Sequence, residues 1–169
     1  MKLIVKVVAF TSMLITSGAM AQGYWGASYT DVKVSGDGVG DNLLDLTSLN
    51  VNGGYKINEY LSLEARLGMG INSPSVEGET DIDLDYLASA FVVGHLPTST
   101  PFTPYAVLGY SKAKLGAFDD SGSESDVSFG IGTKYKVSDS LAINVEYAKL
   151  ADKSGVEIDG ISFGFTSNF

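Results

Sequence analysis

The chain has a single histidine, His95, and many serines, so a serine nucleophile activated by histidine is the first chemistry to consider. The imidazole must lie within hydrogen-bond distance of the hydroxyl whose proton it accepts. His95 comes just before Pro97, at the end of an apolar segment, and no base is evidently held beside any serine. A lone histidine in such a position is more often structural than catalytic. We therefore expect no enzymatic activity.

Acidic residues gather in two stretches that could bind a hard cation such as Ca²⁺ through several carboxylate oxygens. The first contains Asp81, Asp83 and Asp85, whose alternation places the three side chains on one face of an extended chain. The second contains Asp119 and Asp120. The glycine and the terminal glutamate of an EF-hand loop are missing from both. We interpret both stretches as solvated acidic loops and expect neither a metal site nor a cofactor.

Four other charged residues, Glu64, Arg66, Lys134 and Glu146, lie inside segments that are otherwise apolar or rich in small residues. An unpaired charge that is removed from water costs several kcal/mol, so such residues are expected to pair with one another. All four lie on the polar side of their segments. A closed sheet would bring these polar sides together in its lumen.

The segments that carry these charges alternate between apolar and polar residues, which is the pattern of β-strands with two different faces. The clearest case is 60–71, where the apolar face consists of Leu61, Leu63, Ala65, Leu67, Met69 and Ile71. Segments 127–137, 141–149 and 161–169 repeat the pattern, and four less regular segments cover 23–34, 43–57, 82–96 and 103–115. The sequence thus predicts about eight strands.

The connections between these segments alternate in length. Long polar connections cover 35–42, 72–81, 116–126 and 150–158, whereas short ones lie at 58–59, 97–101 and 138–140. Short turns at one end and long loops at the other are typical of outer-membrane barrels of bacteria. With both termini in the periplasm, the long loops face the outside of the cell.

Alternation does not say which face is buried, because a soluble up-and-down barrel has its apolar face inside. Three features favour the membrane form. The polar face contains mid-strand charges, the chain ends in Phe169, and aromatic residues cluster where strands end, near the expected periplasmic rim. These aromatics are Tyr24, Trp25, Tyr55, Tyr60, Phe102, Tyr105 and Tyr135. We predict an all-β fold, an eight-stranded antiparallel up-and-down transmembrane barrel.

The N-terminus has the features of a secretory signal peptide. Lys2 and Lys6 give a positive start, an apolar run covers 7–15, and Ala19 and Ala21 supply the small residues required for cleavage. The apolar run is shorter than the ~20 residues of a spanning helix. We predict a signal peptide over 1–21 and one barrel domain over 22–169.

Composition narrows the classes of function further. The formal net charge of -9 argues against nucleic acid as a partner, because a phosphate backbone requires a basic surface. The chain has no cysteine, so an exported domain of this kind depends on packing and backbone pairing rather than on disulfides.

The segment 102–111 (FTPYAVLGYS), the segment 60–64 (YLSLE) and the last strand ending in Phe169 together resemble the small outer-membrane β-barrel superfamily of the OmpA transmembrane domain, OmpX, Ail and the opacity proteins. The resemblance covers the whole mature chain. It implies a salt-bridge gate in which Glu64 and Glu146 match the acidic positions. Lys134 is a looser match, and Arg66 is an additional candidate.

The resemblance also implies that Phe169 is the signal recognised by the barrel assembly machinery, although Ser167 stands where that signal usually has a hydrophobic residue. Related barrels include lipid A acyltransferases and deacylases, which use a histidine near the outer leaflet. Our topology places His95 at the opposite rim. Outer-membrane lipid and lipopolysaccharide are the expected surroundings of a monomeric barrel.

These observations lead to one expected function and three alternatives. We expect a non-enzymatic outer-membrane barrel that supports envelope integrity and displays acidic extracellular loops. A narrow, weakly cation-selective gated pore through the charged lumen is the first alternative, although eight strands normally fill their own interior. The second is an adhesin or a protein that binds host factors through its loops. The least favoured is an enzyme that modifies lipid A.

Overall fold

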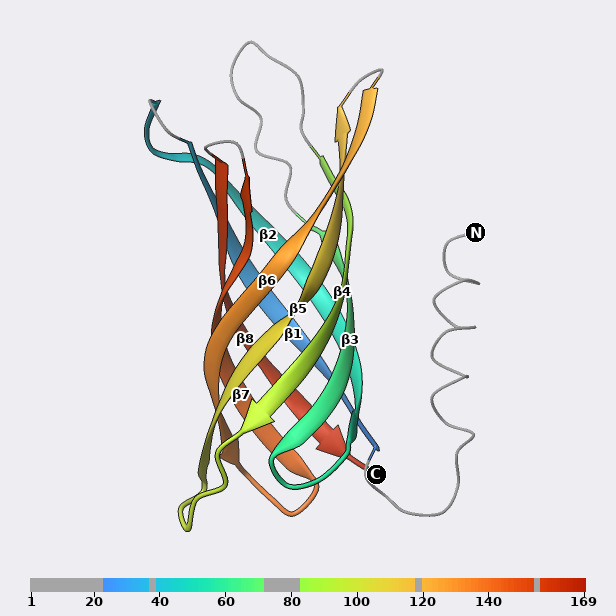
Figure 1. The fold of residues 1–169 in the computed structure, drawn as a ribbon, viewed down its shortest axis with the longest axis vertical. Coiled ribbons are helices and arrows are strands. Elements are labelled where there is room, and N and C mark those ends of the chain that lie inside the picture. Colours follow the sequence, from blue (N-terminus) through green and yellow to red (C-terminus); the bar gives the residue numbers. More distant parts are fainter. Residues whose placement is uncertain (1–22, 37–38, 72–82, 118–119, 154–155) are drawn as a thin grey trace.

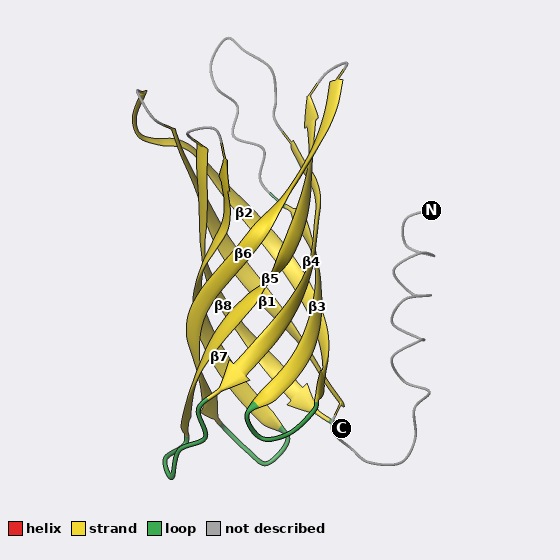
Figure 2. Cartoon of the chain, in the orientation of Figure 1, coloured by secondary structure: helices red, strands yellow, loops and turns green. Residues whose placement is uncertain are grey.

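The computed structural model describes residues 23–36, 39–71, 83–117, 120–153 and 156–169. They form a closed barrel in which each strand pairs antiparallel with the next and β8 returns to pair with β1 (Figures 1 and 2). The predicted all-β, eight-stranded up-and-down barrel is confirmed. The strands are β1 (Gly23–Gly36), β2 (Val39–Lys56), β3 (Leu61–Gly70), β4 (Asp83–His95), β5 (Phe102–Ala117), β6 (Asp120–Lys136), β7 (Leu141–Lys153) and β8 (Val156–Asn168).

Closure follows from the requirement that backbone groups inside a bilayer pair with one another. A sheet can meet this requirement only when its first and last strands also pair, since an open edge would leave N–H and C=O groups unsatisfied in hydrocarbon. The β1–β8 ladder runs from Tyr24↔Asn168 to Gly36↔Val156 without a break in register. Even the shortest strand, β3, has 10 residues, which matches the ~9–11 residues that span a bilayer.

The inner face of the barrel is polar and small over much of its area. Ser48, Ser62 and Ser128 are fully buried, and an apolar cluster of Phe91, Val93, Tyr105 and Val107 packs on β4 and β5. Two inward-facing tyrosine rings lie over glycines that leave room for them. A Cβ atom on Gly54 would overlap Cζ of Tyr24, and one on Gly132 would lie 2.5 Å from Cζ of Tyr105. These glycines allow the rings to cross the lumen.

The outer wall carries the apolar face of every strand. Its large side chains are about half exposed, and Ile131 reaches 67 %. Trp25, Tyr55, Tyr60, Phe102 and Tyr135 are exposed near the turns, as predicted. The other two predicted rim aromatics, Tyr24 and Tyr105, point into the lumen instead and are only 2 % and 6 % exposed. In β1 the adjacent Trp25 takes the outward position, so alternation turns Tyr24 inward.

The two ends of the barrel differ. The short turns after β2, β4 and β6 lie at one end, together with the start of β1 and the C-terminus (Figure 1). We call this the turn end and the opposite one the loop end. The backbone N–H of Phe169 donates to the carbonyl oxygen of Gly23 at 3.2 Å, which joins the last residue to the first strand. The predicted signal peptide, 1–21, lies outside the described residues. Within those residues, no helix is long and apolar enough to cross a membrane.

Irregular pairing is confined to the loop end. In the β4–β5 ladder, Leu84 pairs with Leu115 and Tyr86 with Lys114, so Asp85 is an inserted residue in a bulge. The side chains of Asp81, Asp83 and Asp85 lie outside the described part of the structure, so their shared face stays a prediction.

Candidate functional site: the charged interior

The centre of the lumen holds an ion-pair network between opposite walls of the barrel. Arg66 on β3 binds Glu146 on β7 through two parallel contacts, Nη1 to Oε1 at 2.5 Å and Nη2 to Oε2 at 2.9 Å. Its Nε also donates to Oε1 of Glu64 at 2.6 Å. Strands β3 and β7 are four places apart in a ring of eight, so the network crosses the full lumen. The planar guanidinium group suits this arrangement because its donors are fixed in a fork.

Alternation along the strands delivers these side chains to the interior. Glu64 and Arg66 are two residues apart on β3 and therefore lie on the same face. Both carboxylates are nearly inaccessible, with Glu64 6 % and Glu146 2 % exposed. The lumen placement expected for Glu64, Arg66 and Glu146 agrees with the geometry. Which partner each residue binds could not be predicted from the sequence.

Aromatic residues surround the network. The hydroxyl of Tyr24 donates to Oε2 of Glu64 at 2.7 Å, and the guanidinium carbon of Arg66 lies 4.5 Å from the centroid of the Phe91 ring. Lys134 also lies in the lumen, as expected, where two aromatic rings contact it and the carboxylates of Glu64 and Glu146 attract it electrostatically. Its Nζ is 4.9 Å from the Tyr24 centroid and 5.3 Å from the Tyr105 centroid. Such contacts stabilise a cation through the ring quadrupole.

The interior around this network is filled. Cavities lined by network residues measure about 20 Å³ each, which is room for one water molecule. Arg66 and Glu146 line both of these cavities. In the described part of the barrel, the network and the tyrosine rings thus narrow the space between these residues to small voids.

Toward the loop end, small hydroxyl and amide side chains connect adjacent strands. The amide of Asn50 donates to Thr30 at 2.8 Å, and Thr30 lies 2.8 Å from Oγ of Ser162. On the opposite wall, Ser128 donates to Ser111 at 2.7 Å, and Ser111 lies 2.8 Å from Ser89. These contacts join uncharged side chains, so the positions of the charged residues did not predict them. The signal that could have found them is the high share of serine, threonine and asparagine on the polar faces.

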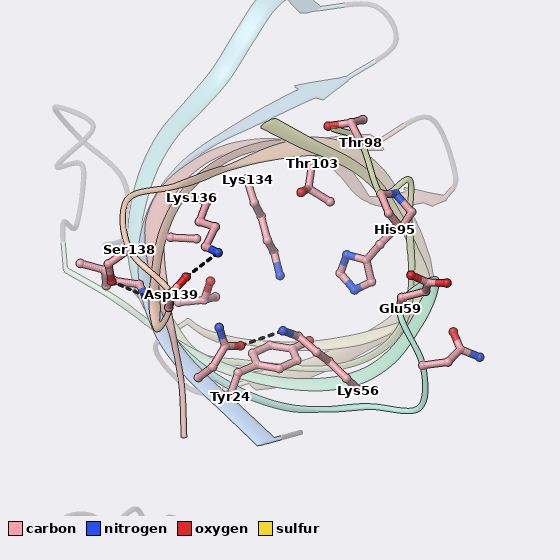
Figure 3. A pocket seen from close by; sticks show the side chains of 16 residues that line it. Tyr24, Lys56, Glu59, His95, Thr98, Thr103, Lys134, Lys136, Ser138 and Asp139 are labelled. Carbon is pink, nitrogen blue, oxygen red and sulfur yellow. Dashed lines mark hydrogen bonds and ion pairs between the residues drawn. The ribbon is translucent and has the colours of Figure 1, made fainter. Parts of the chain in front are cut away.

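A larger cavity of about 530 Å³ opens at the turn end of the barrel. Figure 3 shows Lys134 projecting into its centre, with Lys56 on the wall opposite and His95 to one side. Lys56 donates to Oδ1 of Asn168 at 2.9 Å. At the outer edge, Lys136 binds Asp139 at 2.7 Å, and this hydrogen bond lowers the pKa of the Asp139 carboxyl group.

His95 has a serine partner that the sequence did not indicate. Its Nε2 lies 2.5 Å from Oγ of Ser62, across the β3–β4 ladder. A serine–histidine nucleophile also requires the two groups to be within hydrogen-bond reach of each other. However, Ser62 has no exposed surface, so its hydroxyl offers a substrate no approach. The pair therefore has the geometry of a structural contact, at the turn end where our topology placed His95.

The acidic residues assigned to the loops are only partly described. Asp81 and Asp119 lie outside the described residues, and for Asp83, Asp85 and Asp120 the structure describes the backbone alone. Among the residues whose side chains are described, no group of three or more potential ligands could hold a metal ion. Phe169 is exposed at the turn end, and the ring lies under 3 Å from where a Cβ of Gly23 would be. The assembly role expected for Phe169 stays a prediction.

Comparison with known proteins defines the class. The model of the outer-membrane protein β-barrel domain family matches residues 7–169, so the chain belongs to this family. No curated protein matches it in a sequence search.

Solved structures with the same fold are distant in sequence. Ail, the attachment invasion locus protein of Yersinia pestis, solved in complex with the heparin analogue sucrose octasulfate, is 17 % identical with a TM-score of 0.66, covering 89 % of this chain and 100 % of that chain. Neisserial surface protein A is 21 % identical with a TM-score of 0.63 over 90 % and 100 % of the two chains. The N-terminal barrel domain of Pseudomonas aeruginosa OprF is 16 % identical with a TM-score of 0.55 over 87 % and 99 %. The expected membership of this group of small barrels is confirmed.

Proposed function

We propose that this protein is a non-enzymatic, closed outer-membrane barrel that supports the envelope and presents its loops outside the cell. The observation that carries the proposal is the Glu64–Arg66–Glu146 network, which joins opposite walls at the centre of the lumen. A cross-lumen network of buried charges opposes both conduction and deformation, because breaking it would leave charges unpaired in a low-dielectric interior. This favours a rigid plug over the gated pore.

The surface of the barrel supports a position among outer-membrane lipids. Outward-facing Tyr86, Tyr110 and Tyr147 lie farther toward the loop end than the aromatics near the turns, so the apolar wall has aromatic residues on both borders. Past them, Lys112 is exposed at the loop end. An ammonium group at the loop-end border of the apolar wall can bind a phosphate group of lipopolysaccharide. In this orientation the turn end and both termini face the periplasm, and the chain acts as a monomer.

An adhesin is the second candidate, favoured by the long β-hairpins at the loop end. Strands β5 and β6 pair as far as Ala117↔Asp120, well past the apolar wall (Figure 1). Ail, which has the same fold, was solved with a heparin analogue. The acidic loops of the present chain are a poor match for such a polyanion, because like charges repel. A host ligand of this chain would therefore differ in chemistry from sulfated glycans.

A deletion strain complemented with variants separates these functions. Loss of the protein is expected to increase sensitivity to detergent and to large antibiotics, and a variant that lacks 116–126 should restore resistance. Cell or matrix binding that disappears with the 116–126 deletion would instead identify an adhesin. Loss of a lipid A acyl chain on overexpression, abolished by His95→Ala, would identify an enzyme. Unchanged envelope resistance in the deletion strain would contradict the proposed envelope role.

A further inference from the structure

The cavity at the turn end is lined by basic side chains that do not belong to the Glu64–Arg66–Glu146 network. Its volume of about 530 Å³ falls within the ~300–1,000 Å³ typical of small-molecule sites. Three lysines and one histidine line it, although the mature chain is strongly acidic overall. The two acidic residues on its lining do not balance these cations at the centre. Glu59 is exposed, and Asp139 is fully exposed and bound to Lys136.

Lys134 is the central element of this cavity. The rings of Tyr24 and Tyr105 hold its ammonium group from two sides, at 4.9 and 5.3 Å. A lysine ammonium group has three N–H donors. Among the described residues its close contacts are ring faces, which leave these donors free to bind an acceptor in the cavity. Figure 3 shows the side chain extended toward the open centre rather than toward the wall.

Lys56 and His95 provide a second side to the cavity. Within the part of the chain that the structure describes, the ammonium group of Lys56 donates to Asn168 at 2.9 Å, which leaves two of its three N–H donors. His95 is anchored through Nε2 to Ser62, so its other ring nitrogen remains for a ligand. Lys56 and Lys134 are close enough to interact electrostatically with each other and with His95, while Glu64 and Glu146 of the network attract Lys134 from the centre of the lumen. Two like charges that face one cavity repel unless an anion lies between them.

We propose that this cavity is an anion site that binds a phosphate group, with Lys134 and Lys56 as its charged ligands. A phosphate group has three or more acceptor oxygens and carries up to about two negative charges near neutral pH, so it can accept from both ammonium groups at once. Lysine binds phosphate as a point charge without requiring a planar fork. The group can belong to a free phosphate anion or to the headgroup of an anionic phospholipid in the adjoining leaflet.

Titration of the purified protein with inorganic phosphate tests the proposal. The protein, obtained from membranes of cells that express the full chain, is followed by amide NMR spectra in detergent and in phosphate-free buffer. We expect saturable shifts at Tyr24, Tyr105 and Lys134. Lys134→Gln and Lys56→Gln should each weaken binding at least tenfold, whereas Lys134→Arg should retain it. Lys112→Gln, which removes an exposed lysine at the other end of the barrel, is the matched control and should bind normally.

Nanodiscs distinguish the two sources of the phosphate group. A lipid headgroup is identified if nanodiscs of phosphatidylglycerol shift the same resonances and compete with inorganic phosphate. The free anion is identified if these nanodiscs leave phosphate binding unchanged. Either result supports the site. Heat-modifiable mobility in gels confirms that each variant is folded. The proposal would be overturned if the wild-type protein showed no saturable phosphate binding. It would also be overturned if the folded Lys134→Gln and Lys56→Gln variants bound phosphate as tightly as the wild type.

Discussion

Replacement of Arg66 by methionine tests whether the lumen network stabilises the barrel. The substitution removes the cation but keeps a similar length of apolar side chain, so the loss of packing is small. It leaves Glu64 and Glu146 without the guanidinium group that each now binds at 2.5–2.6 Å. Both carboxylates are almost fully buried and would have to protonate, recruit water or move.

The expected loss of stability follows from this burial. Removal of one partner from a buried ion pair costs about 3–5 kcal/mol, mostly because the other charge is left uncompensated. The Arg66 side chain is 20 % exposed, so water reaches part of the site and partly screens the loss. We therefore expect a decrease of about 3 kcal/mol in the free energy of unfolding for Arg66→Met.

Urea unfolding from lipid vesicles measures this loss. Trp25 is the only tryptophan of the chain and lies on the outer wall, so its emission reports the transfer from lipid to water. Lys136→Met breaks the exposed pair with Asp139 and is the matched control, for which we expect no measurable change. The triple variant Glu64→Gln, Arg66→Met, Glu146→Gln removes all three charges and should be more stable than Arg66→Met alone. Exposed ion pairs contribute at most about 1 kcal/mol. A decrease in the free energy of unfolding below this value for Arg66→Met would refute a stabilising role of the network.

Three further predictions follow from the wall, the ends and the terminus. Ile131→Arg puts a charge on the lipid-facing wall and should cost about 2–4 kcal/mol in vesicles; no loss would contradict a lipid-facing Ile131. The chain has no cysteine, so an impermeant maleimide should label Ser123→Cys but not Asp139→Cys on intact cells, and the reverse would invert our orientation. Deletion of Phe169 should reduce the heat-modifiable, folded fraction in outer membranes; normal assembly would exclude it as the assembly signal.

The alternation in 60–71 and 127–137 predicts the strands and their two faces, and the mid-strand charges, the rim aromatics and Phe169 indicate which face is turned to lipid. The same alternation placed Glu64, Arg66 and Glu146 in the lumen, because residues two apart share a face. Local sequence is enough to place residues on a face because side chains alternate with a period of two. A shift of the strand by one residue would turn its whole apolar face into the lumen.

The contacts inside the lumen could not be predicted in the same way. The Arg66–Glu146 pair joins strands that are not neighbours, so it depends on how far each strand is shifted when the barrel closes. Tyr24 is an exception, because alternation with the outward-facing Trp25 turns its ring inward although its place near the start of a strand suggests the rim. The Ser62–His95 contact depends on register in the β3–β4 ladder, which no local pattern encodes.

Current through single protein molecules in a planar lipid bilayer tests the central claim, that the lumen is closed by its charged network. The protein is first refolded into vesicles and its folded state confirmed. Our account predicts a silent bilayer with folded wild-type protein, because the network and the tyrosine rings fill the lumen between cavities of about 20 Å³. Discrete steps that favour cations, and that change in size or lifetime in Glu64→Ala, would contradict it and identify a gated pore.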